Sequence, residues 1–147
     1  MQVIYQALSE DQETFHCLSG LQVADFDALY DDFAAAWSRL KMERRRYTGQ
    51  AQPSRAGRKF AVSLRDQLLS VLLWFNLGLH PQDLSKLLGV HLSTFARIRQ
   101  RVLAVLYDLN MPVEPPEPHQ YQRIGYLSHV WHLPAFADTS EMNAKTR

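Results

Sequence analysis

Hydroxyl and guanidinium side chains gather between residues 91 and 101 of this 147-residue chain, at helical spacing. Arg97 offers a fork of parallel N–H donors, the geometry that fits the O6 and N7 acceptors of guanine. Ser93 and Thr94 carry hydroxyls that can bond to bases or phosphates. Arg101 lies one helical turn after Arg97, where contacts to the DNA backbone are expected. These residue types at this spacing indicate the reading of double-stranded DNA.

The elements that must position these side chains have the spacing of a helix-turn-helix over residues 81–109. A short helix over 81–88 begins with proline in its first turn. Gly89 follows where the turn requires a positive φ angle. A longer amphipathic helix then runs from about Leu92 to Leu109. The apolar residues expected to hold the two helices together are Leu84, Leu88, Phe95 and Ile98.

The net charge of +1 hides a strong polarity along the chain. Residues 1–38 contain seven acids and neither Lys nor Arg, whereas residues 39–65 contain nine bases against Glu43 alone. A basic block beside a helix-turn-helix is what phosphate neutralisation requires. The bases of this block expected to contact phosphates are Arg44, Arg45, Arg46, Arg55, Arg58 and Lys59. About half of the polarity has a structural explanation, because acids at the start of a helix and bases at its end complement the helix dipole.

The remaining pattern is also helical, which predicts a mainly α fold: a small helical bundle that contains the helix-turn-helix, with an irregular C-terminal tail. Apolar residues recur at helical spacing from Val23 to about Arg45. Ser63 is a candidate N-cap for an apolar helix that Gly78 ends. The predicted divisions are an N-terminal segment 1–20, the bundle 21–110, a proline-rich linker 111–118, and a tail 119–147.

Several classes of protein are excluded by composition. A single cysteine, Cys17, forms neither an intramolecular disulfide nor a thiolate metal site. The longest apolar stretch, Leu68 to Leu79, falls well short of the ~20 residues that span a bilayer. His129 and His132 lack an evident third ligand, so no metal site is expected in this chain alone. A cytoplasmic protein without membrane contact is the expectation.

The residues from Ser63 to Ile98 resemble the N-terminal helix-turn-helix of DDE-superfamily transposases from IS5-like insertion sequences. The resemblance covers about residues 15–110 and is most specific from Gly78 to Ile98, which includes the run LSKLLGVHLSTFARI. It implies that the chain binds the ends of a mobile element through the second helix of the module.

The segment from Leu133 to Glu141 is similar to that family's short strand ending in Asp-x-Thr-Glu, and Asp138 matches the first of its three metal-binding acids. The resemblance implies a ribonuclease-H-like domain in which two Asp and one Glu hold two Mg²⁺ ions. The second Asp and the Glu lie far downstream in the family and have no place in these 147 residues. We therefore expect no nuclease activity and no cofactor for this chain alone, with Mg²⁺ bound only when a complete catalytic domain is supplied.

Three hypotheses follow. The first is the DNA-binding portion of a transposase, associated with the nucleoid, whose partners are the terminal repeats of its element, the catalytic part of the transposase and a second copy of itself. The second is a stand-alone helix-turn-helix transcription regulator. The third is an inert remnant of a transposase.

Overall fold

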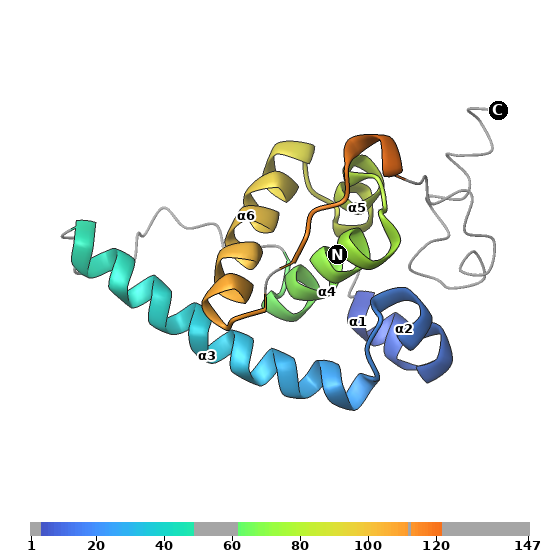
Figure 1. Cartoon of the computed structure of the whole chain (residues 1–147), viewed down its shortest axis with the longest axis horizontal. Coiled ribbons are helices and arrows are strands. Elements are labelled where there is room, and N and C mark those ends of the chain that lie inside the picture. The colour runs from blue at the N-terminus through green and yellow to red at the C-terminus, as the bar shows by residue number, and fades with distance from the viewer. Residues whose placement is uncertain (1–3, 49–61, 112, 122–147) are drawn as a thin grey trace.

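The computed structural model describes residues 4–48, 62–111 and 113–121, with the backbone alone for residues 45–48. Within these ranges the chain forms six α-helices, one short 3₁₀ helix and no β-strand (Figure 1). They are α1 (Ile4–Ser9), α2 (Gln12–Ser19), α3 (Val23–Thr48), α4 (Leu64–Leu77), α5 (Pro81–Leu88), α6 (Leu92–Asp108) and η1 (Pro118–Gln120). The expected fold class, a mainly helical small bundle, is confirmed.

Helix α4 is the centre of the bundle because its side chains are apolar almost all round. Every residue from Asp66 to Trp74 is buried, and α1, α2, α3, α5 and α6 all pack against this helix. The sequence signals at its ends are confirmed. The Ser63 hydroxyl accepts the Asp66 N–H at 3.2 Å, and Gly78 ends the helix in the left-handed region with φ +65°.

Helices α1 and α2 are part of the bundle, although residues 1–20 were expected to form a separate segment. Ile4 and Leu8 of α1 and Phe15 and Leu18 of α2 are all in the hydrophobic core. The core therefore begins at Ile4 and not at residue 21. Burying four large apolar side chains stabilises the fold by roughly 1.5–3 kcal/mol each, so these helices contribute a substantial part of the core.

Two polar side chains of α4 form hydrogen bonds with the backbones of α1 and α2, which lie far away in the sequence. The buried Asp66 carboxylate accepts the backbone N–H of Tyr5 at 2.9 Å and also that of Ile4, and it thereby caps the start of α1. At the other end of α4, Asn76 donates to the carbonyl of Leu18 at 2.9 Å, in the last turn of α2. These contacts join residues about sixty positions apart, which no local pattern reports.

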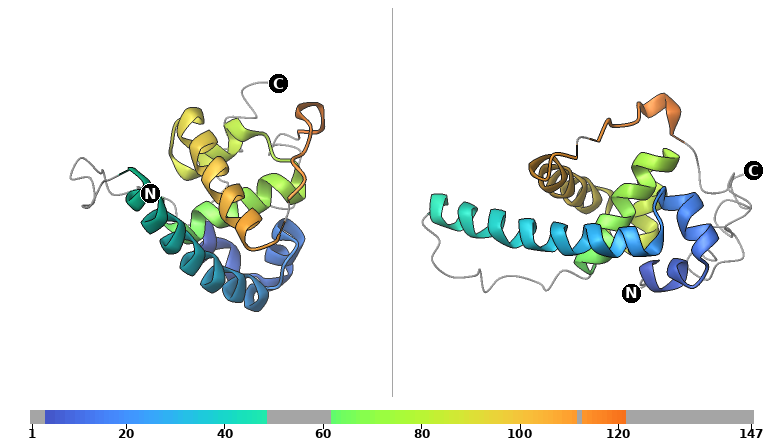
Figure 2. Two further views of the ribbon diagram at one scale, coloured as in Figure 1. Left: turned by 60° about the vertical axis from the view of Figure 1, so that its left-hand side comes forward. Right: turned by 60° about the horizontal axis from the view of Figure 1, so that its bottom comes forward.

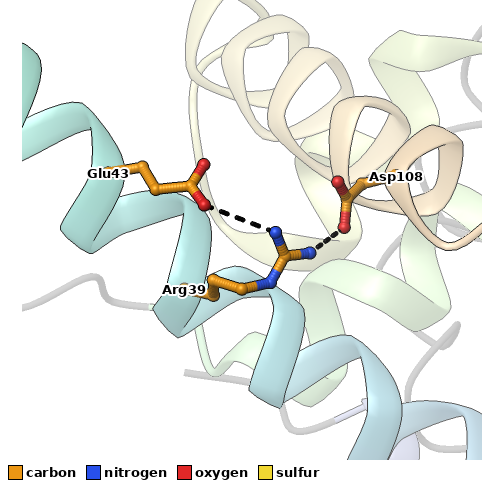
Figure 3. Close-up of polar contacts among 3 residues, drawn as sticks. All are labelled: Arg39, Glu43 and Asp108. Carbon is orange, nitrogen blue, oxygen red and sulfur yellow. Dashed lines mark hydrogen bonds and ion pairs between the residues drawn. The ribbon is translucent and has the colours of Figure 1, made fainter.

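Helix α3 crosses the bundle and its C-terminal end extends beyond α6, as Figures 1 and 2 both show. Ala36 is the last buried side chain described in this helix, Trp37 and Leu40 pack partly buried against the core, and residues 41–44 are exposed. Arg39 is paired with Asp108 at the end of α6 and with Glu43 at 3.5 Å (Figure 3). Because the Arg39 side chain is 53% exposed, these ion pairs contribute less than about 1 kcal/mol; the pair with Glu43 lies within α3, and the pair with Asp108 joins α3 to α6.

Residues 113–121, which we call the strap, return from the end of α6 to the junction of α4 and α5 (Figure 1). Tyr121 packs against the core, and its hydroxyl accepts the Trp74 indole N–H at 3.4 Å. Its ring meets that of His80 edge-on, with ring centroids 5.6 Å apart. The strap overlaps the proline-rich segment 111–118, which was expected to be a linker, and it lies folded on the bundle. Residues 122–147, most of the expected tail, lie outside the described residues.

Candidate nucleic-acid interface

The first helix of the expected helix-turn-helix has the start that the sequence predicted. His80 is the N-cap of α5, and its Nδ1 atom accepts the Gln82 N–H at 3.1 Å. Pro81 occupies the first turn, where a missing N–H costs no hydrogen bond. Leu84, Leu87 and Leu88 are buried in the core.

A tight turn of three residues, 89–91, joins α5 to α6. Gly89 has φ +69°, as expected, and a Cβ atom added there would meet no atom within 4 Å. The glycine is therefore required by backbone conformation alone. The Val90 N–H donates to Ser85 O at 2.9 Å and the Gly89 N–H to Lys86 O at 3.1 Å, the pairing that closes a helix with a left-handed residue.

Helix α6 divides cleanly into a buried face and an outward face. Phe95, Ile98 and Val102 are buried against the bundle. On the outward side Ser93 and Arg97 are exposed, one turn apart. Thr94 and Arg101 lie at the edge of this face and are half-buried. The helix thus brings the four side chains expected to contact DNA onto its first three turns, next to the turn that follows α5.

The charge of α6 is entirely positive until its last residue. Arg97, Arg99 and Arg101 precede Asp108, which is the first acid of the helix. The Arg99 guanidinium lies over the Trp74 ring, 5.0 Å from its centroid, and makes a cation–π contact with it. Trp74 thereby contacts both the strap and α6, a connection that the sequence did not indicate.

Some bases of the block 39–65 interact with other side chains of the same chain. Arg39 pairs with Glu43 and Asp108. The Arg65 guanidinium lies between two aromatic rings, 4.7 Å from the centroid of Tyr5 and 4.5 Å from that of Tyr30. The sequence count of nine bases therefore overstates the charge available to a ligand, since at least Arg39 and Arg65 have partners within the chain.

The other bases expected at phosphates are less fully described. Arg44 is exposed near the C-terminal end of α3. Arg45 and Arg46 belong to the last turns of α3, where only the backbone is described. Arg55, Arg58 and Lys59 lie outside the described residues, as do Asp138, His129 and His132. Their assigned roles remain predictions.

Two further features lie at the start of α6, where the sequence places His91 and Leu92 outward. His91 occupies the N-cap position, with φ −70° and ψ 154°, and its side chain makes no capping hydrogen bond. Leu92, the first residue of the helix, is 46% exposed. Helical spacing alone places Leu92 on the outward side of the second helix. How far its side chain is exposed depends on the packing of α5 against α6.

The described part of the chain offers no cluster of three or more His, Cys, Asp and Glu side chains that could hold a metal ion. Within the same ranges, no helix combines the length and apolar character needed to cross a membrane. Comparison of the chain with protein-family models, with curated proteins and with solved structures found no match.

Proposed function

We propose that this chain is the DNA-binding portion of a transposase and that it recognises the ends of an insertion element. One observation carries the DNA-binding part: Ser93 and Arg97 are exposed on the second helix of a helix–turn–helix pair whose other face is buried in the core. A helix presented in this way fits the major groove of B-DNA. The resemblance of residues 63–98 to transposase modules supports the kind of protein and of target.

In this mechanism the first turns of α6 enter the major groove. Arg97 donates two hydrogen bonds to O6 and N7 of a guanine, and Ser93 and Thr94 bond to neighbouring bases. Arg101 contacts the sugar-phosphate backbone and fixes the register of the helix. Arg44, at the extended end of α3, contributes to the neutralisation of phosphates together with the basic segment that follows it.

Strand cleavage and transfer belong, in this proposal, to a catalytic domain of which Asp138 supplies the first acid. A complete set of carboxylates there would bind two Mg²⁺ ions, which activate the attacking oxygen and stabilise the leaving one. The present chain supplies recognition. Its proposed partners are double-stranded DNA, the catalytic part of the transposase and a second copy of itself, in the cytoplasm at the nucleoid.

Selection of bound sequences from random double-stranded DNA by the full chain tests the proposal. We expect one enriched motif, present in inverted orientation at the two ends of the element that surrounds the gene. A motif found only in a promoter region would replace transposition with transcriptional regulation. Absence of any enriched motif would contradict sequence-specific DNA binding and leave the chain as a remnant.

A further inference from the structure

Leu92 stands out on α6 because it is a large apolar residue that remains 46% exposed. The core takes Phe95, Ile98 and Val102 from this helix, whereas Leu92 is 46% exposed at the first position. The exposed part of this isobutyl group is apolar surface in contact with water. Contact with another apolar group would bury that surface, which is favourable.

The residues around Leu92 favour DNA as the partner that its side chain contacts. With 100° of rotation per residue, Leu92 and the half-buried Ala96 lie on one edge of the outward face and Arg97 lies about 140° around the helix from Leu92. Ser93 is between these edges. The outward face thus pairs an apolar edge with a hydrogen-bonding, positively charged edge, and no acid lies on the helix before Asp108.

The major groove contains one apolar group that identifies a base, the 5-methyl group of thymine. We propose that Leu92 contacts this methyl group and so specifies a thymine in the recognised site. The distance along the helix axis between Leu92 and Arg97 is about 7.5 Å, so we expect the thymine close to the guanine read by Arg97. This inference depends on the proposed DNA-binding function and adds a second specified base to it.

Replacing each thymine of the selected site by deoxyuridine, one position at a time, removes only the methyl group. Binding of the full chain to each duplex is measured by fluorescence anisotropy. At one position we expect the dissociation constant to rise about fourfold, the factor that burial of one methyl-sized group contributes. Because the change is in the DNA, it does not disturb the folding of the protein.

Leu92→Ala assigns the effect to this side chain. In that variant the thymine duplex and the deoxyuridine duplex should bind equally, since the contact is already lost. Tyr107→Ala is the matched control, because Tyr107 is an apolar residue of the same helix that is 78% exposed near the opposite end. That variant should keep the fourfold methyl effect.

The outcomes separate the inference from the function on which it depends. A selected site in which no thymine is sensitive to methyl removal, or a methyl effect that persists in Leu92→Ala, would overturn the role of Leu92 and leave DNA recognition standing. Failure to select any sequence would overturn both.

Discussion

The buried carboxylate of Asp66 gives the sharpest prediction about the fold. Its side chain is 1% exposed and accepts the N–H groups of Ile4 and Tyr5 at the start of α1. Asp66→Ala leaves these N–H groups without their acceptor, and hydrogen bonds to a charged group contribute about 1.5–3 kcal/mol each. Removal of the buried charge offsets part of this loss, so we expect the free energy of unfolding to fall by about 2–3 kcal/mol.

The pH dependence of stability tests the same residue without removing the acceptor. Burial is the largest influence on Asp66 and raises the pKa of its carboxyl above the ordinary value of 3.8, against the opposing effect of its hydrogen bonds. The carboxyl has its ordinary pKa in the unfolded state and the raised pKa in the folded state. Between these two pKa values the folded state binds more protons than the unfolded state, so the free energy of unfolding falls as pH rises through this window. Asp66→Asn keeps an oxygen acceptor and should abolish this part of the slope.

Urea unfolding followed by the helical circular dichroism signal, from about pH 4 upward, measures both effects. Asp32→Asn is the matched control, because Asp32 is an exposed aspartate on α3. We expect the control to follow the wild type in slope. A slope in Asp66→Asn equal to that of the wild type, or stability that rises with pH because of Asp66, would refute the assignment.

Three further changes test other parts of the structure. His91→Ser supplies the missing cap of α6 and should raise the free energy of unfolding by about 1 kcal/mol in urea titrations; no gain would contradict the N-cap geometry. Tyr121→Phe leaves the buried Trp74 indole N–H without its acceptor and should cost about 1 kcal/mol, whereas the exposed Tyr107→Phe should cost nothing. Arg44→Gln should lower the slope of log K against log salt by about 0.9 if Arg44 contacts one phosphate, and an unchanged slope removes it from the interface.

Local signals were sufficient for the elements that form the candidate interface. Ser63 and Gly78 mark the ends of α4, and Pro81 and Gly89 mark those of α5, because caps and left-handed residues act within one helical turn. The buried face of α6 followed from apolar spacing in the same way. These predictions are confirmed by the structure, and they fix which side of α6 faces outward.

Long-range contacts account for what the sequence did not indicate. Asp66 reaches Tyr5 across 61 positions, and Trp74 meets Tyr121 across 47. Arg65 counts in the sequence as one more base of the charged block, yet its guanidinium lies between the rings of Tyr5 and Tyr30. Such partners are brought together by the packing of the whole bundle, so neither charge sums nor periodicity could assign them.

The most direct test of the account compares Arg97→Ala with the wild type on the selected DNA site and on random DNA of equal length. If Arg97 reads a base, Arg97→Ala should lose about 1–3 kcal/mol of binding free energy on the selected site, change little on random DNA, and show relaxed preference at one base pair. Arg39→Ala removes the same charge from a side chain paired with Asp108 and should leave affinity for both DNAs unchanged. Equal losses on both DNAs for Arg97→Ala, or no loss on either, would contradict base recognition by α6.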